Sequence, residues 1–429
     1  MSWLKNKLKS FINELFLDDL KKEIKADLLH VRMRIYREIN QLKLDEMYIR
    51  DFKKPAQDTS CVTSQTPLNF VFFDYTQLYH PSNMHNLGDF IQTIVAKNAI
   101  FSAFGIKNDL NAAICICDDY VKGLRIPLEH SIKASSIFNK NNELFQKYSN
   151  ITSSYFCSSR LNCFRSEANE INIAINQAYI GGGVPTYLPS YDIRCLWHSI
   201  HYEQAAKDSI LLLNSVRPDF WNGVEVGARD RSTLEFFKSL GVKSYFSRCL
   251  TLTLPLRSKE QEQKADKVFL VNLDDDFIKK LPSSITQNAA IINQRFIKVD
   301  GIYDEKHYFD MTRNLLMRYA NEASLVITSA VHCAGPCIAM GIPVVLVDFC
   351  KEIGKDNERF SIFDGILRVY KPEEVDKIDF NNVKAPNIED LKVAMLKNVS
   401  LSLEALLTGK KDPKLDELRD FISNYKVNI

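Results

Sequence analysis

Short apolar runs and longer amphipathic stretches alternate from about residue 66 to the end of the chain. Runs rich in Val, Ile, Leu and Phe, such as 69–75 and 268–272, have the length and composition of buried strands. Residues 111–117 fit the same description. Stretches with apolar residues at helical spacing, such as 89–104 and 308–320, separate these runs. Strands that alternate with helices predict an α/β fold built on parallel sheets.

A charged stretch at 257–267, RSKEQEQKADK, divides this pattern into two halves. Each half is rich in βαβ units, so we predict two Rossmann-like domains that face a cleft, at 66–256 and 267–410. A helical tail follows, and its last helix occupies 411–429. Residues 118–168 show no regular period and are interpreted as an insertion or a lid over the cleft.

The first 55 residues follow a different pattern and predict a helical arm at 1–55. They contain no Gly and no Pro before Pro55, and apolar residues in 17–42 recur at steps of three and four. The steps form an eleven-residue period, which is typical of a long helix with little or right-handed supercoil. This helix either pairs with a copy of itself, giving a coiled-coil homo-oligomer, or packs on the globular body. In 3–12, apolar residues alternate with Lys, as in a helix at a membrane surface; packing on protein is the alternative.

Composition narrows the function classes. The chain of 429 residues is 45% hydrophobic and 25% charged, as in ordinary globular proteins, and its net charge of +2 gives no reason to expect a nucleic-acid partner. Its ten cysteines form no paired CxxC framework, which argues against zinc and suits a reducing compartment. No apolar run reaches about 18 residues. We expect a cytoplasmic protein, with peripheral contact at the inner face of the membrane through 3–12.

The most informative stretch is VITSAVHCAGPCIAMGIPVV at 326–345. A buried strand ends at Thr328 and Ser329, and His332 follows at the start of a helix of small residues. Ligands of open α/β sheets bind at the carboxyl ends of strands, beside helix N-termini. His332 is therefore a candidate for binding an anionic substrate and delivering a proton. The alternative is a histidine that only satisfies a buried backbone group.

Two further motifs carry candidate binding residues. In VGARDRS, Arg229 follows a strand and precedes a helix, where its guanidinium can bind a carboxylate or phosphate. The alternative is a surface ion pair with Asp230. In NLGD, the residues Asn86, Gly88 and Asp89 open a helix whose free amides can bind an anion or a sugar hydroxyl. The alternative here is a simple capping turn.

The segment 181–202 contributes weaker candidates. Three glycines at 181–183 form a loop that a phosphate can approach, but neither GKS nor GxGxxG follows them. Strand 194–202 ends with Ser199 and His201, which alternation places on one face, toward the cleft. Both side chains can equally be polar groups satisfied locally at a strand end.

The order of these motifs resembles the polysaccharide pyruvyl transferase family. The quoted blocks are NLGD, LPSYDIR…HSIHY, VGARDRSTLEFFKSLGV…SRCLTLTL and VITSAVHCAGPCIAMGIPVV, and they cover about residues 66–375. The resemblance implies a two-domain, GT-B-like fold with the acceptor side at 66–256 and the donor side at 267–410. It also implies transfer of pyruvate from phosphoenolpyruvate to a sugar of a bacterial surface glycan or a lipid-linked precursor, with no metal or other cofactor.

The resemblance assigns roles to residues and also shows one departure. His332 corresponds to the family's donor-binding residue and acid, and Arg229 to a residue that holds the donor's anionic groups, with Ser329 beside them. The family usually has Arg where this chain has Ala330. The change from Arg to Ala removes roughly 1.5–3 kcal/mol of charge-assisted bonding to the donor. The candidate replacements in the following loop are Lys351, Lys355 and Arg359. If none of these cations replaces the Arg, two alternatives follow. The donor differs, as in a GT-B glycosyltransferase that uses a nucleotide sugar, or the protein is a non-catalytic scaffold.

Overall fold

The computed structural model describes most of the chain from residue 66 onward. The described residues are 66–74, 84–106, 109–121, 124–128, 142–148, 150–157, 164, 170–175, 179–180, 192–202, 207, 210–211, 214, 218–297, 305–350 and 358–427. The predicted arm at 1–55, with its segments 3–12 and 17–42, lies outside these residues, as do the glycines at 181–183 and the residues Lys351 and Lys355.

The first half of the described chain contains a five-stranded sheet with the order β3-β4-β1-β5-β7. Its pairs β1–β4, β1–β5 and β5–β7 are parallel, and only the edge strand β3 is antiparallel. The strands are β1 (Leu68–Asp74), β3 (Ile126–Pro127), β4 (Ile151–Cys157), β5 (Ile171–Ile175) and β7 (Ile193–Leu196). All of β1 is buried, because a parallel strand that is covered on both faces selects a continuous apolar run such as LNFVFFD.

Two smaller pairs of parallel strands extend this half. They are β6 (Tyr179–Ile180) with β8 (His201–Tyr202), and β9 (Val226–Ala228) with β10 (Ser244–Phe246). A bridge between Ile200 and Ala228 joins the region of β8 to the end of β9, where the backbone NH of Arg229 donates to the carbonyl of Ile200 at 2.7 Å. The carboxyl end of β9 therefore lies beside the segment that carries His201.

The second half contains an all-parallel sheet with the order β12-β11-β14-β15-β16. Its strands are β11 (Lys267–Val271), β12 (Ala289–Ile292), β14 (Ala323–Thr328), β15 (Val344–Val347) and β16 (Val369–Tyr370). The crossovers include α10 (Glu305–Glu322) and α11 (Val331–Ala339). Strand order reverses around β11, so ligands are expected at the carboxyl ends of β11 and β14. The hydroxyl of Ser329 joins these two ends by donating to the carbonyl of Asn272 at 2.6 Å.

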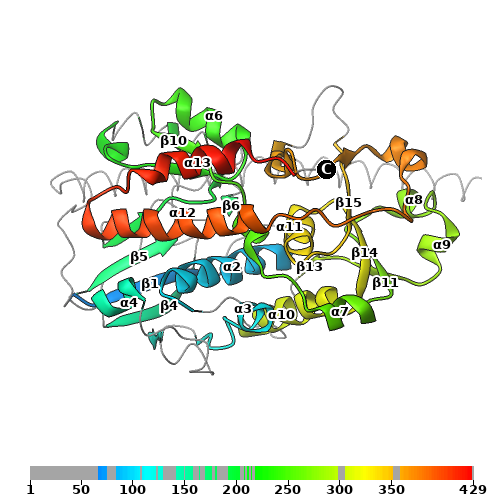
Figure 1. The fold of residues 1–429 in the computed structure, drawn as a ribbon, viewed down its shortest axis with the longest axis horizontal. Coiled ribbons are helices and arrows are strands. Elements are labelled where there is room, and N and C mark those ends of the chain that lie inside the picture. Colours follow the sequence, from blue (N-terminus) through cyan, green and yellow to red (C-terminus); the bar gives the residue numbers. More distant parts are fainter. Residues whose placement is uncertain are drawn as a thin grey trace, which may run out of the picture.

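Elements from both halves pack against one another in the middle of the molecule. Figure 1 shows the two sheets at opposite ends of the long axis, with α2 (Leu87–Ala103) and α11 between them. Strand β13 (Arg295–Ile297) of the second half pairs antiparallel with β2 (Met84–Asn86) of the first. Helix α11 contacts both α2 and the 3₁₀ helix η5 (Leu250–Thr253), and Gly335 of α11 leaves the space that Thr251 occupies. One large apolar cluster contains residues of both halves.

The C-terminal helices run back to the first half. Helix α12 (Glu389–Thr408) packs along α2, and α13 (Lys414–Asn424) contacts α12 and β10 (Figure 1). The molecule is thus a mixed α/β protein with parallel sheets, as the sequence predicts. The domain division at 66–256, 267–410 and 411–429, and the GT-B-like cleft, stay predictions.

The remaining described helices are short and lie mostly between strands or after them. They are α3 (Leu110–Ile114), α4 (Glu143–Lys147), η4 (Pro218–Trp221), α6 (Arg231–Ser239), α7 (Lys259–Lys264), α8 (Asp275–Ile278), α9 (Ser283–Thr286), η6 (Glu358–Phe363) and η7 (Pro372–Lys377). The charged connector predicted at 257–267 contains α7, which begins with a capping box between Ser258 and Gln261.

Two sequence predictions in the first half are wrong. Residues 111–117, predicted as a strand, contain part of α3, because the side chain of Asp109 caps that helix by accepting from the NH of Ala112 at 3.0 Å. An apolar run of this length does not distinguish a strand from a buried helix. The segment 118–168, predicted as irregular, contains β4, which pairs with β1 along its whole length.

The predicted strand 194–202 is interrupted, so its alternation does not hold. Regular pairing stops at Leu196, and Ser199 has a φ of 59° in the left-handed region. The hydroxyl of Ser199 accepts from the NH of Leu250 at 3.1 Å and is buried. Ser199 is therefore a local structural residue, as the alternative interpretation had it.

Candidate functional site

The two residues on which the sequence analysis depends lie in contact. Arg229 follows β9 of the first half, and His332 lies in the first turn of α11 in the second half. Nη1 of Arg229 is 3.2 Å from Nε2 of His332, across 103 positions of sequence. Both are buried, with 1% and 8% of their surface exposed. The resemblance gives both residues a role at one donor, and the structure brings the guanidinium and the imidazole together; their roles stay predictions.

The guanidinium of Arg229 has only a partial set of partners. Its Nη1 also donates to Oε1 of Gln92 on α2 at 3.2 Å, and its Nε lies 3.8 Å from Oδ2 of Asp230. Among the described residues, Nε has no hydrogen-bond partner although it is buried. A buried, permanently charged group with an unused donor is costly unless an acceptor completes it, so this atom is suited to an anionic ligand.

The contact with Arg229 fixes the protonation state of His332. A guanidinium can only donate hydrogen bonds, so Nε2 of His332 must accept, and the imidazole is neutral with its proton on Nδ1. Burial, and next the charges of Arg229 and Arg359, lower the pKa of His332 well below its usual value. Without a bound anion, therefore, His332 does not carry the second proton that an acid needs.

The NLGD turn meets His332 directly. The side chain of Asn86 caps α2 by accepting from the NH of Gly88 at 3.0 Å, as the capping interpretation predicts. The turn also approaches the site closely, because a Cβ on Gly88 would lie 2.8 Å from Cβ of His332. Asp89 accepts from Nε2 of Gln92 at 3.4 Å. Burial raises the pKa of Asp89 to about 6, against the opposing charges of nearby arginines.

His201 and Asp230 form a pair behind Arg229. Nδ1 of His201 lies 2.5 Å from Oδ2 of Asp230, whose other oxygen accepts from the NH of Thr233 and caps α6. Burial and the charge of Arg229 lower the pKa of His201 to about 4. Burial opposes ionisation of Asp230, yet its contacts with His201 and Arg229 bring its pKa down to about 2. Asp230 is therefore a buried carboxylate that anchors the end of β9, and the surface-pair interpretation of Arg229 and Asp230 does not fit its burial.

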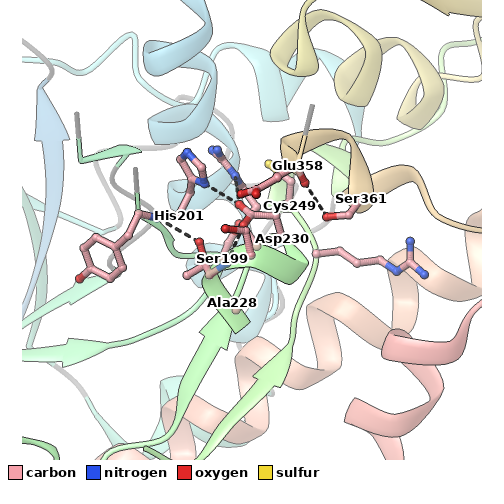
Figure 2. A network of polar contacts seen from close by, with 12 residues as sticks. Ser199, His201, Ala228, Asp230, Cys249, Glu358 and Ser361 are labelled. Carbon is pink, nitrogen blue, oxygen red and sulfur yellow. Dashed lines mark hydrogen bonds and ion pairs between the residues drawn. The ribbon is translucent and has the colours of Figure 1, made fainter. Parts of the chain in front are cut away.

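Residues of η6 approach the same region from the second half. Figure 2 shows Glu358 and Ser361 of η6, where the hydroxyl of Ser361 donates to the carbonyl of Glu358 at 2.8 Å. The hydroxyl of Ser361 accepts from the NH of Arg231 at 3.0 Å, which docks η6 on the start of α6. Arg359 lies between these two η6 residues, and its charge reaches His332, His201 and Asp89, lowering the pKa of each. Of the predicted residues, Ser329 is used to join β11 and β14, and the others surround Arg229 and His332.

Sequence reasoning missed Arg295 and Gln92. Arg295 lies opposite Asn86 in the β13–β2 pair, and its charge lowers the pKa of both His332 and Asp89. Gln92 joins Asp89 to Arg229. No sequence signal marks Arg295, because only the pairing of two short strands about 200 residues apart brings it to the site. Gln92 lies one helical turn after Gly88, which is a detectable signal.

Replacing Gly88 by Ala is expected to lower both the affinity for the donor that the family resemblance implies and its turnover by about 10²-fold, because catalytic geometry tolerates little displacement. The new Cβ would lie 2.8 Å from Cβ and 2.9 Å from Nδ1 of His332, so either α2 or α11 must shift. The measurement is donor titration with turnover assays. Gly223→Ala is the control. The φ of +75° at Gly223 makes an Ala there strained, but its Cβ would meet no atom within 4 Å, so this strain arises without a contact to His332. Equal effects of the two substitutions on donor affinity would contradict the close approach.

No cluster of three or more His, Cys, Asp or Glu side chains that would hold a metal ion occurs in the part of the chain that the structure describes. Among the same residues, no helix has the length and apolarity that a membrane crossing requires.

Taken together, the fold and the site define an α/β protein whose two halves meet at a buried contact between a guanidinium and an imidazole. Residues 221–350 match the family model of polysaccharide pyruvyl transferase. This segment is less than half of the chain and contains Arg229, Asp230, Ser329 and His332. The match confirms the resemblance seen in the motifs and indicates a transferase that modifies polysaccharides. No curated protein matches the chain.

Proposed function

We propose that this protein transfers the pyruvyl group of phosphoenolpyruvate to a sugar of a bacterial surface glycan or its precursor. The observation that supports the proposal is the contact between Nη1 of Arg229 and Nε2 of His332 at 3.2 Å. It joins an anion-binding group to a proton-transfer group within the segment that matches the family. Pyruvyl transfer needs both groups, because the donor carries two anionic groups and an alkene carbon that must be protonated.

The reaction balances with the groups of this site. A proton adds to the methylene carbon of the donor, which becomes a methyl group, and the central carbon becomes electrophilic. One sugar hydroxyl adds to that carbon, the bond from carbon to the phosphate oxygen breaks, and phosphate leaves. The second hydroxyl then adds, giving a cyclic ketal that retains the carboxylate. One proton is consumed at carbon and two are released from the hydroxyls, so the net change is one proton, which the departing phosphate accepts.

Donor binding supplies the proton-transfer state that the unliganded site lacks. Burial is the main reason why the pKa of His332 is low, and an anion that takes up the donors of Arg229 offsets the second cause, the positive charge of that guanidinium. The pKa of His332 then rises, and Nε2, released from Arg229, becomes available to hold the transferable proton. Asp89, whose pKa is raised to about 6, is linked to Arg229 through Gln92 and is a second group of this site that can change its protonation near neutral pH.

A glycosyltransferase that uses a nucleotide sugar is the second candidate. The observation that favours it is Ala330, which starts α11 with no side-chain cap and no cation where the family usually has Arg. A diphosphate bound at the start of α11 would use the backbone NH groups of the first turn of that helix and the charge of Arg229. In either case we propose a cytoplasmic enzyme that works on a glycan or a lipid-linked sugar, without a metal or other cofactor.

Thermal unfolding with candidate donors separates the two functions. A ligand that binds only the folded protein stabilises it by about 2.7 kcal/mol at a concentration 100 times its dissociation constant. We expect phosphoenolpyruvate to raise the melting temperature of the full chain, and Arg229→Gln to remove most of that rise. Chloride at equal ionic strength is the control. Stabilisation by a nucleotide sugar and not by phosphoenolpyruvate would replace the first candidate by the second.

A further inference from the structure

The ribbon formed by β2 and β13 brings a third arginine to the site. Arg295 of β13 is the direct partner of Asn86 in this antiparallel pair. The neighbouring residue Gln294 is buried, and its carbonyl accepts from the NH of Leu87 at 3.0 Å, which ties β13 to the start of α2. The position of Arg295 relative to α2 is therefore set by backbone contacts on both sides of the ribbon.

The pairing also determines the side from which Arg295 approaches. In an antiparallel pair, side chains of directly opposite residues leave the ribbon on the same face. The side chain of Asn86 turns toward the NH of Gly88, and Gly88 lies against His332. Arg295 consequently leaves the ribbon on the face where Gly88 and His332 meet. The charge of Arg295 is felt there, because it contributes to lowering the pKa of His332 and of Asp89.

The guanidinium of Arg295 is available for a ligand. Its backbone NH is held by Asn293, but within the described part of the chain its side chain forms no hydrogen bond and no ion pair, and the residue is exposed. Buried Arg229, in contrast, is held by Gln92 and His332. The site thus combines one fixed, buried guanidinium with one exposed guanidinium of open bonding capacity.

Two helix N-termini add to this positive field. Helix α2 has 17 residues and α11 has nine, and their first turns meet where Gly88 lies against His332. Each N-terminus carries about half a positive charge. The buried Nε of Arg229, which lacks a hydrogen-bond partner among the described residues, points independently to an absent acceptor. A ligand with two anionic groups fits such a site better than one with a single charge.

We propose that Arg295 binds the phosphate of the donor, while Arg229 binds its carboxylate. This assignment rests on the proposed transfer from phosphoenolpyruvate. The exposed position of Arg295 suits the phosphate, which must leave the site once its bond to carbon breaks. The buried position of Arg229 suits the carboxylate, which stays in the ketal product and must be held while the hydroxyls add. Arg295 thereby supplies a cation that the sequence at Ala330 does not.

Calorimetric titration of the full chain tests this assignment with three ligands: phosphoenolpyruvate, inorganic phosphate and pyruvate. For Arg295→Gln we expect phosphoenolpyruvate and phosphate to bind about tenfold more weakly or worse, and pyruvate to bind as before. Arg295→Lys keeps the charge and should recover part of the loss. Arg368→Gln is the matched control, because Arg368 is an exposed arginine that directly precedes β16. This substitution should change the affinity for each of the three ligands by no more than about twofold.

The outcomes separate this inference from the proposed function. If Arg295→Gln binds phosphoenolpyruvate and phosphate as tightly as the unmodified protein, the role of Arg295 is refuted while the transferase proposal stands. If the unmodified protein binds neither phosphoenolpyruvate nor phosphate, both the role of Arg295 and the transferase proposal are refuted. An equal loss of pyruvate binding in Arg295→Gln, at an unchanged melting temperature, would refute the assignment of phosphate to Arg295, since both arginines would then act on the carboxylate.

Discussion

Replacing His332 by Gln is expected to lower turnover by about 10²–10⁴-fold, the usual contribution of a positioned acid or base. Gln can still accept a hydrogen bond from Arg229, which now contacts Nε2 of His332 at 3.2 Å, so the buried guanidinium keeps a partner. It cannot carry a transferable proton. The melting temperature and the affinity for phosphoenolpyruvate should therefore change little while turnover is lost. The measurement is phosphate release from phosphoenolpyruvate in the presence of glycans from the source cells.

His307→Gln provides the matched control for this experiment. His307 is an exposed histidine of α10, and the same substitution there should leave turnover unchanged. Retained turnover in His332→Gln would remove His332 from proton transfer. Asp89 would then be the remaining candidate, because its pKa is raised to about 6 and Gln92 connects it to Arg229. A fall in the melting temperature of His332→Gln would show a loss of folding, so the melting temperature separates this effect from a loss of proton transfer.

Lys97→Met is expected to destabilise the protein by about 3–5 kcal/mol, the usual effect of removing one partner from a buried ion pair. The side chain of Lys97 on α2 is fully buried, and its Nζ lies 2.6 Å from Oδ2 of Asp119. Nζ also donates to the hydroxyl of Tyr155 at 2.9 Å, and that hydroxyl donates to Asp119 at 2.8 Å. Met fills the space of Lys but leaves the buried carboxylate of Asp119 without its cation, while the hydroxyl of Tyr155 still donates to it.

Chemical unfolding with urea measures this effect from the shift of the midpoint. The double variant Lys97→Met, Asp119→Leu removes both charges and should recover much of the loss, because an apolar pair of similar volume often replaces a buried ion pair at little cost. The exposed pair Lys279–Asp276, at 2.9 Å, is the control, and Lys279→Met should change stability by less than about 1 kcal/mol. A midpoint for Lys97→Met equal to that of Lys279→Met would show that the buried pair contributes nothing.

The sequence predicts the second half better than the first for a physical reason. Strands β11, β14 and β15 are mostly apolar runs followed by the polar residues Asn272, Ser329 and Asp348, and the adjoining helices α10 and α11 have clear boundaries. In the first half, β4 has the sequence ITSSYFC, and its serines and threonine conceal a strand in which buried and partly exposed residues alternate. Its polar side chains are satisfied inside the sheet; Ser154, for example, accepts from the amide of Asn69 at 3.0 Å. Local hydrophobicity does not reveal such partners.

For the site, local sequence placed individual residues but not their partners. The strand ends before Arg229 and Ser329 and the helix starts at Asn86 and His332 follow from motif patterns, and only the family resemblance suggested that Arg229 and His332 belong together. The protonation of His332 was not predictable, because it depends on a donor from a strand end 103 positions away. The interruption of the strand before His201 likewise depends on backbone contacts with β9.

By itself, then, the amino-acid sequence determined the class of fold, most strands and helices of the second half, and the chemical types available to the site. These follow from periodicity, turn chemistry and the positions where strands end, all of which act over a few residues. The tertiary structure alone decided that Gly88 and His332 touch, that His332 accepts a hydrogen bond, and that Arg295 reaches the same place. Such facts arise from the packing of α2 on α11 and from the pairing of β2 with β13, where segments distant in the chain meet through a shared core.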